Sequence, residues 1–120
     1  MSYDKNNIFA KILRGEIACK KVYENEFVLS FYDINPQKKI HVLVIPKGEY
    51  INLDDFVDKA SEKEIVEFNK AITHIVKMLK ISNQEGGYRL LSNTGHDAGQ
   101  EVPHLHYHIF GGEKIGKMVI

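Results

Sequence analysis

Three histidines alternate with apolar residues close to the end of the chain, within the segment Pro103–Phe110. Side chains alternate between the two faces of a β-strand, so a strand here would place all three imidazoles on one face. The histidines are His104, His106 and His108, and the other face carries Leu105, Tyr107 and Ile109. That apolar face has to be covered by the core, so the histidines should face the ligand side. Imidazoles titrate near neutral pH, which suits them to nucleophilic attack, proton transfer or metal binding.

Three explanations of this histidine row compete. A solvated polar surface is the simplest, but such surfaces usually carry Lys, Glu and Thr. A zinc site needs each nitrogen at ~2.0–2.1 Å from the ion, whereas His104 and His108 would stand about 13 Å apart along a strand. A regular strand therefore does not let all three bind one ion, although His41 or His96 could approach in the fold. The third explanation is nucleophilic and acid–base chemistry on a phosphate.

A loop that contains Gly95 and Gly99 precedes the row, at residues 93–102. A glycine-bearing loop between two strands can turn its N–H groups toward an anion. The loop has no lysine or arginine, so a phosphate bound here would meet amides and imidazoles rather than full positive charges. The loop and the histidines converge at the same end of the predicted strand, which favours phosphate chemistry over the other two explanations.

Residues 99–112 resemble the histidine-triad signature, His-φ-His-φ-His-φ-φ, in which φ is an apolar residue. Similar segments occur upstream at residues 8–12, 33–37 and 41–47, which look like the N-terminal helix and the first sheet segments of that family. The resemblance covers about residues 8–112. The glycine pair Gly111-Gly112 resembles the Hint branch, the nucleoside phosphoramidases, rather than the Fhit-like dinucleoside polyphosphate hydrolases.

The resemblance implies a covalent mechanism in which His106, the middle histidine, is the nucleophile. It would attack the α-phosphorus of a nucleotide and form a nucleotidyl-histidine, while its other ring nitrogen donates a hydrogen bond to the carbonyl of His104. Splitting the displacement into two steps makes each step easier. His108 would contact the phosphate oxygens and stabilise developing charge, and His41 would complete the catalytic cluster. The other phosphate contacts implied are Asn93, the Gly99 amide, the Gln100 side chain and the backbone N–H of Glu101.

A nucleoside site is implied in the same way. Asp33 resembles the carboxylate that accepts hydrogen bonds from both ribose hydroxyls. The apolar slot for the base would be formed by Ile8, Phe9, Ile12, Phe31 and Ile34, and Tyr32 would line the ribose pocket. The five slot residues also suit an ordinary core, and the sequence favours the core for Ile12 and Phe31.

Glu101 departs from the pattern of eukaryotic Hint-type proteins. Those proteins have a serine at this position, which is thought to touch the phosphate and assist the leaving group. A carboxylate beside a phosphate is repulsive unless it is protonated or turned away. We therefore expect only the backbone N–H of Glu101 to contact phosphate, and no general acid is assigned. A solvated loop position is the alternative for its side chain.

The elements that must position these residues can be predicted from patterning. Asn7 suits the cap of a short helix over Ile8–Leu13. Ser61 and Glu64 form a capping-box pattern for an amphipathic helix over Glu62–Lys80. Five strands are expected, namely Lys21–Glu24, Glu26–Asp33, Ile40–Ile45, Tyr88–Asn93 and Pro103–Phe110. We expect an α+β fold in which these strands form an antiparallel meander, with both helices on one face of the sheet and the functional site on the other.

Length and composition bound the class of protein. The chain has 120 residues, 43% hydrophobic and 27% charged, which predicts a single globular domain over residues 1–120. Sixteen basic and sixteen acidic residues balance, so no basic excess favours binding to nucleic acid. No apolar run approaches the ~20 residues that span a bilayer, and no signal peptide is visible. The single cysteine, Cys19, excludes an intramolecular disulfide. We expect a soluble, cytoplasmic protein.

The predicted activity is hydrolysis of purine nucleoside 5′-phosphoramidates, or of AMP linked to an amine or acyl group, with release of the nucleoside monophosphate. The resemblance implies a homodimer whose sheets join edge to edge, and neither a metal nor an organic cofactor is expected. Two alternatives remain at this point. One is a nucleotide-binding interaction protein whose hydrolysis is vestigial, and the other is a zinc-binding module. The sequence leaves open the leaving group and the choice between adenine and guanine.

Overall fold

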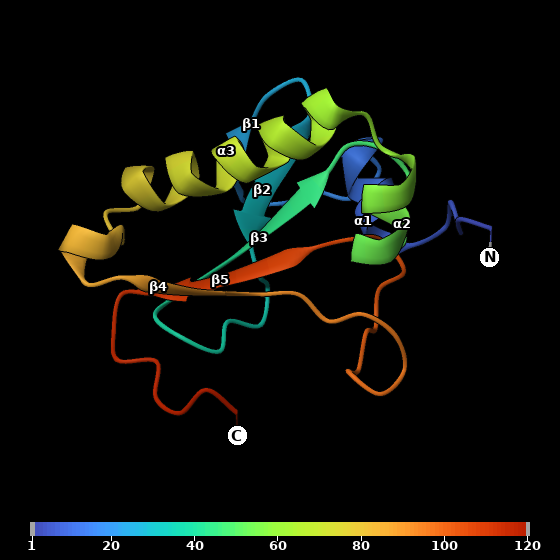
Figure 1. Ribbon diagram of the computed structural model, residues 1–120. Helices are drawn as coiled ribbons and strands as arrows, with labels where there is room; N and C mark the ends of the chain where they lie inside the picture. The colour runs from blue at the N-terminus through green and yellow to red at the C-terminus, as the bar shows by residue number, and fades with distance from the viewer. Residues whose placement is uncertain (1, 120) are drawn as a thin grey trace.

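The computed structural model describes residues 2–119 of the chain. Five strands form one antiparallel sheet (Figure 1). They are β1 (Lys21–Glu24), β2 (Val28–Tyr32), β3 (Ile40–Pro46), β4 (Tyr88–Leu91) and β5 (Tyr107–Gly111), and the order across the sheet is β1-β2-β3-β5-β4. The first three strands follow one another as the expected meander, but β5 lies between β3 and β4. After β3 the chain runs through α2 and α3 to β4 at the edge of the sheet, and β5 then pairs between β3 and β4.

Three α-helices accompany the sheet: α1 (Ile8–Leu13), α2 (Leu53–Lys59) and α3 (Glu62–Met78), with a short 3₁₀-helix over Asn83–Glu85. The predicted caps of α1 and α3 are present, because the Asn7 side chain accepts from the Ala10 N–H and Ser61 with Glu64 forms a capping box. Helix α2 was not predicted, although Asn52 caps it in the same way and acidic residues follow in its first turn. At its other end α3 stops two residues early, because Lys80 adopts a left-handed φ of 59°.

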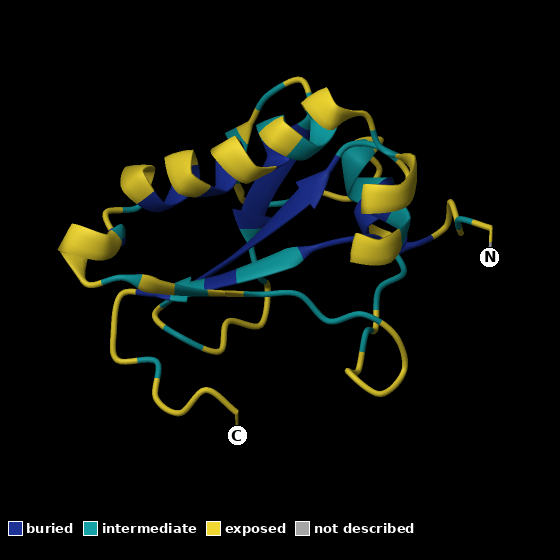
Figure 2. Ribbon diagram, viewed as in Figure 1, coloured by how far each residue is buried: buried dark blue, intermediate teal, exposed yellow. Residues whose placement is uncertain are grey.

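The two faces of the sheet are covered by different helices. Helix α3 packs on one face, where its buried residues meet β2, β3 and β5 in the larger core (Figure 2). Those helix residues are Phe68, Ala71, Ile72, Ile75 and Val76. Helix α1 lies against the opposite face, where Phe9 packs with Leu29, Phe31, Leu43 and Ile45. The expectation that both helices share one face is therefore wrong, since α1 forms a wall of the site face.

Strand β5 begins later than the alternating pattern suggested. Its ladder starts at the Val44–Tyr107 pair, and residues 103–106 precede it. A proline has no N–H to donate, so Pro46 at the end of β3 cannot continue the ladder. The Leu105 N–H instead donates to the carbonyl of Tyr50 at 2.8 Å. His104 and His106 thus stand outside the regular strand, and the prediction of one strand over Pro103–Phe110 is corrected.

The apolar face of the triad packs as predicted. Leu105 and Ile109 are buried in the α3 core, and the Tyr107 ring meets Phe68 edge to face at 5.3 Å. Burying an aliphatic side chain of this size stabilises a fold by about 1.5–3 kcal/mol. Within residues 2–119, no helix combines the length and the apolar character that crossing a bilayer requires.

Candidate active site

A cavity of about 370 Å³ opens on the α1 side of the sheet. Its walls come from three distant parts of the chain: α1, the segment from β2 to β3, and the loop before β5 with the triad. The lining residues are Phe9, Asp33, Asn35, Gln37, His41, Leu43, Asn93, Gly99, Gln100, Glu101, Val102, His106 and His108. The fold therefore brings together three of the four predicted catalytic histidines and all four predicted loop residues.

His106 is held in one tautomer by the backbone. Its Nδ1 lies 2.7 Å from the carbonyl oxygen of His104, and a carbonyl only accepts, so Nδ1 carries the proton. This is the hydrogen bond that the resemblance implied. In a neutral imidazole the other nitrogen, Nε2, is then a bare lone pair. The Phe9 ring meets the imidazole edge to face at 5.0 Å, and burial lowers the pKa of His106 below its ordinary value. His106 is therefore neutral at pH 7.

His41 and His108 are hydrogen-bonded to each other, and this pair places the proton of His108 on Nε2 rather than on Nδ1. The Gln37 N–H donates to Nδ1 of His41 at 3.1 Å, so in the neutral ring Nε2 carries the proton. That Nε2–H donates to Nδ1 of His108 at 2.9 Å, which leaves the proton of neutral His108 on Nε2. Within residues 2–119 this N–H of His108 has no hydrogen-bond partner. His108 is therefore a donor available to a ligand in the cavity.

Burial keeps this histidine cluster uncharged. It lowers the pKa of His108 to about 4, with His106 and then His41 adding to the effect, while Asp33 opposes it. Burial also lowers the pKa of His41, again against the influence of Asp33. A cluster of neutral imidazoles provides one nucleophilic lone pair and one N–H donor without an excess of positive charge.

His104 differs from its two partners. Its side chain is fully buried, it does not line the cavity, and its Nε2 donates to the carbonyl of Pro46 at 2.9 Å. Its Nδ1 then accepts from the hydroxyl of Tyr3. Burial lowers the pKa of His104 to about 4, so the ring is neutral. The prediction that all three histidines stand in one ligand-facing row is wrong for His104, because residues 103–106 leave the strand geometry.

The loop over residues 93–102 is braced by its own hydrogen bonds. The Gly99 N–H donates to the carbonyl of His96 at 3.0 Å, so this amide is not free for a phosphate. The Gln100 side chain donates to the carbonyls of Ile51 and Val102 at 2.7 and 3.0 Å, and it accepts from Gly95 at 3.0 Å. Gly99 and Gln100 line the cavity, and these hydrogen bonds brace the loop, so the phosphate contacts expected of both residues stay predictions.

Asn93 and Glu101 remain as loop contacts at the cavity. Both line it, and the N–H of Glu101 has no partner among residues 2–119. The Glu101 side chain is exposed, as the solvated-loop alternative requires. The backbone N–H of Glu101 can donate to an anion in the cavity while its carboxylate stays in solvent.

Of the predicted nucleoside residues, Asp33 and Phe9 line the cavity. The Asp33 carboxylate accepts from the Asn35 N–H at 2.8 Å and lies 3.5 Å from Nε2 of His41. The other five predicted residues lie outside the cavity wall: Ile12 and Phe31 belong to the α1 core, Ile8 and Ile34 are 40% and 94% exposed, and Tyr32 packs on the α3 face. Tyr32 is misplaced in the prediction because neighbouring strand positions face opposite sides.

Several functional contacts were missed from sequence. Gln37 contacts His41 through its backbone N–H, a group that almost every residue type carries, so the sequence does not indicate this contact. Ser92 donates to the carbonyl of His106 at 2.9 Å and restrains the backbone of that histidine. Tyr3 lies 101 positions from the histidine that it contacts. The hydroxyl of Ser92, next to the predicted strand end, was the one available signal.

The zinc alternative can be tested against the geometry. One ligand atom each from Asp33, His41 and His108 lies within 4.8 Å of the others. The two histidine nitrogens are 2.9 Å apart and joined by a hydrogen bond. One carboxylate oxygen of Asp33, Oδ1, accepts from the Asn35 N–H, and Oδ2 faces His41.

Comparisons with known proteins show the family to which the chain belongs. The chain matches the family model described as HIT domain over residues 14–115. It is 53% identical over 118 residues to a HIT-like protein of Azospirillum brasilense, covering 98% of this chain and 95% of the relative. It is 38% identical over 120 residues to the purine nucleoside phosphoramidase of Escherichia coli K12, covering 96% and 94%.

A solved structure extends the agreement to three dimensions. The histidine triad protein from Clostridium difficile is 39% identical and has a TM-score of 0.83, with 97% of this chain and 98% of that chain covered. All four predicted catalytic histidines fall within the residues that the family model matches. From the shared fold, the matched sequence and the histidine cluster, this chain belongs to the HIT-domain, or histidine triad, family.

Proposed function

We propose that this protein hydrolyses purine nucleoside 5′-phosphoramidates, or AMP linked to an amine or acyl group, through a nucleotidyl-His106 intermediate. The observation that carries the proposal is the pair of opposite tautomers on one cavity. His106 presents a bare Nε2 as a nucleophile, and His108 presents an Nε2–H as a donor. A phosphoryl centre needs both, since one nitrogen attacks phosphorus while the N–H stabilises charge on its oxygens.

The chemistry then runs in two displacements. In the first, Nε2 of His106 forms a bond to the α-phosphorus, and the bond to the leaving group breaks. A leaving amine departs with the electrons of that bond and takes up a proton from solvent. In the second, water attacks the same phosphorus and gives a proton back to solvent, the bond to His106 breaks with its electron pair returning to Nε2, and the nucleoside monophosphate leaves. No step in this sequence requires a metal ion.

The cavity also carries groups that suit a nucleoside. The Asp33 carboxylate lies beside the histidine cluster, and two oxygens of a carboxylate can accept from both ribose hydroxyls. The Phe9 ring supplies an apolar surface in the same cavity. The cavity volume of about 370 Å³ falls within the usual range for small-molecule sites, about 300–1,000 Å³. The activity named for the Escherichia coli relative supports the choice of phosphoramidates as substrates.

A trapped intermediate tests this proposal most directly. The protein is mixed with adenosine 5′-phosphoramidate, quenched within milliseconds to seconds, and analysed as the intact chain and as peptides. We expect a mass increase of one AMP moiety on the peptide that contains His106. Steady turnover of the same substrate separates hydrolysis from the alternative of a nucleotide-binding interaction protein. Tight AMP binding with neither an adduct nor turnover would contradict the proposal.

A further inference from the structure

The N-terminal segment before α1 reaches the interior next to the catalytic histidines. The hydroxyl of Tyr3 donates to Nδ1 of His104, and the two rings meet edge to face at 5.6 Å. The direction of this bond follows from the other side of the ring, where Nε2 donates to the carbonyl of Pro46. Burial raises the pKa of Tyr3, so its hydroxyl keeps its proton. Tyr3 precedes residues 14–115, the part that the family model matches.

The carbonyl of His104 is the group that sets the tautomer of His106, and sheet pairing does not hold it. Strand β5 begins only at Tyr107, so the backbone of residue 104 lies outside the ladder. The nearest backbone restraint is the bond from Leu105 N–H to the Tyr50 carbonyl. The fully buried His104 ring, bonded on both nitrogens, is therefore an anchor for the carbonyl that follows it.

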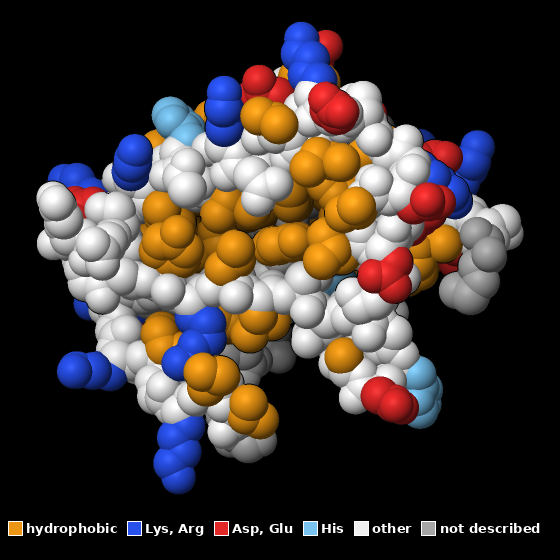
Figure 3. Space-filling view, viewed as in Figure 1, with side chains coloured by type: hydrophobic (Ala, Val, Ile, Leu, Met, Phe, Trp, Pro, Cys, Tyr) orange, Lys and Arg blue, Asp and Glu red, His pale blue; other side chains and the backbone are white. Residues whose placement is uncertain are grey.

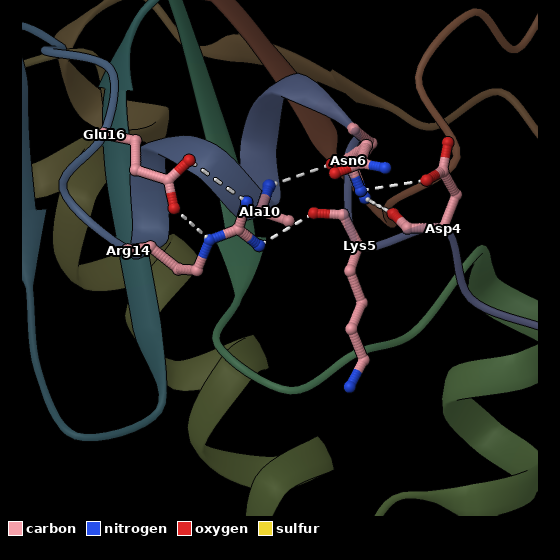
Figure 4. Close-up of polar contacts among 7 residues, drawn as sticks. Asp4, Lys5, Asn6, Ala10, Arg14 and Glu16 are labelled. Carbon is pink, nitrogen blue, oxygen red and sulfur yellow. Dashed lines mark hydrogen bonds and ion pairs between the residues drawn. The ribbon is translucent and has the colours of Figure 1, made fainter.

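The N-terminal segment is itself held in place by a polar network (Figure 4). The guanidinium of Arg14 donates to the carbonyl of Lys5 at 2.7 Å and also binds the Glu16 carboxylate. The buried Asn7 side chain donates to the Asp4 carbonyl at 2.7 Å while it caps α1. The residue next to Tyr3 is thus tied to the helix that supplies Phe9. Such a network gives Tyr3 a defined position, which a loose terminus would lack.

We propose that Tyr3 is a positioning residue for the nucleophile: its hydroxyl fixes the His104 ring, and the His104 carbonyl in turn holds His106 with Nε2 bare. This inference rests on the proposed function, since it assigns Tyr3 to the first displacement. Without the Tyr3 hydroxyl, Nδ1 of the buried His104 ring has no hydrogen-bond donor. The ring then keeps only the bond from its Nε2 to the Pro46 carbonyl. The carbonyl is then less well placed to keep the proton of His106 on Nδ1.

The test compares Tyr3→Phe with Tyr23→Phe. Each substitution deletes one phenol hydroxyl from a part-buried hydrogen bond, and the Tyr23 hydroxyl on β1 accepts from the Asn25 side chain, away from the cavity. Phosphoramidate turnover, AMP affinity and ¹⁵N-histidine NMR are measured at pH 7, at a temperature where both variants are folded. For Tyr3→Phe we expect kcat to fall about tenfold with AMP affinity within about twofold, a pattern of lost transition-state positioning. For Tyr23→Phe we expect kcat within about twofold of the parent.

The NMR arm does not depend on turnover. We expect His106 to be the Nδ1–H tautomer in the parent and in Tyr23→Phe, and to shift toward the Nε2–H tautomer in Tyr3→Phe. A parent that fails to turn over phosphoramidate would contradict the proposed function, and the NMR shift would still support the coupling from Tyr3. Unchanged His106 resonances in Tyr3→Phe, or equal kcat in both variants, would overturn the inference.

Discussion

His106 and His108 are the same residue type two positions apart, yet their hydrogen bonds give them opposite roles. The His104 carbonyl forces the proton of His106 onto Nδ1, and the chain from Gln37 through His41 forces that of His108 onto Nε2. Neither assignment depends on the imidazole itself. At the scale of the residue, the proposed role of each imidazole is thus set by its hydrogen-bond partner, a backbone carbonyl for His106 and the His41 side chain for His108.

His106→Ala should abolish turnover and spare binding. The substitution removes the proposed nucleophile, so we expect less than about a hundredth of the parental rate, a loss of more than ~2.7 kcal/mol. AMP affinity should stay within about tenfold, ~1.4 kcal/mol, because Asp33 and Phe9 lie on other segments. His106 is only 7% exposed, so rates are compared well below the unfolding temperature of each variant.

Asp33→Ala is the matched control, since it should weaken nucleoside binding and leave the nucleophile in place. Calorimetry with AMP and phosphoramidate assays on both variants give the comparison. If His106→Ala retained more than about a hundredth of the rate, water attack assisted by His108 or His41 would be the better account.

The acid limb of activity should lie below pH 6.5. Attack requires neutral His106, and burial lowers the pKa of this group, so the neutral form persists further into acid than an exposed histidine would allow. We expect kcat/KM of the free enzyme to reach half of its plateau value below pH 6.5, because kcat/KM reports free-enzyme pKa values. Circular dichroism at each pH checks that the chain is folded. A half-maximal point above pH 6.5 would argue against neutral His106 as the nucleophile.

At the scale of the element, the loop over residues 93–102 is shaped by one side chain. Gln100 uses both N–H groups and its oxygen on backbone groups of Ile51, Val102 and Gly95. The loop and the start of the 51–59 segment are thereby joined. An amide can do this because it carries donors and an acceptor, whereas a carboxylate of the same shape carries acceptors alone.

Gln100→Glu should therefore loosen the loop without changing its size. The two carbonyls lose their donor and face a negative charge, so we expect AMP affinity to fall about three- to tenfold, with faster hydrogen exchange at the Gly95 and Gln100 amides. Gln84→Glu is the matched control. It makes the same change in charge, and Gln84 is exposed on the 3₁₀-helix. If both variants bound AMP equally well, the Gln100 side chain would not be what holds the loop in its binding conformation.

The parts of the fold and site that the sequence predicts are those with local signals. Capping residues predict where two helices begin, at Asn7 and at Ser61 with Glu64. The alternation of polar and apolar residues predicts that Leu105 and Ile109 lie in the core. The buried position of His104 is not local, because it follows from Pro46 ending the β3 ladder on another strand. The Gln100 brace and the Tyr3 contact depend on backbone groups brought close by tertiary structure, which residue types do not encode.

The whole molecule presents an open sheet edge at β4. Strand β4 has a neighbour on one side only, and its Tyr88 and Leu90 are 36% and 38% exposed. In Figure 3 hydrophobic side chains gather between α3 and this edge. An unpaired edge beside an apolar surface favours pairing with a second copy about a two-fold axis.

We expect a homodimer in which two β4 strands pair, as the resemblance implied. Sedimentation at micromolar concentration should show the dimer, and Leu90→Lys should shift it toward monomer by placing like charges at the pairing edge. Val57→Lys is the control, since Val57 is 58% exposed on α2, away from that edge. A monomeric parent at about 100 μM, or equal effects of both substitutions, would rule out pairing through β4.

The Tyr3–His104 contact also orders events in time, because it joins residues that are 101 positions apart. During synthesis Tyr3 leaves the ribosome long before His104 exists, so the nucleophile cannot be set until almost the entire chain is available. Contacts of such separation form late, after the loops between them have closed. In refolding from denaturant we therefore expect catalytic activity to return after the far-UV circular dichroism signal, in the slowest phase. A nascent chain that ends before residue 104 lacks this contact together with histidines of the cavity, so we expect it to turn over no phosphoramidate.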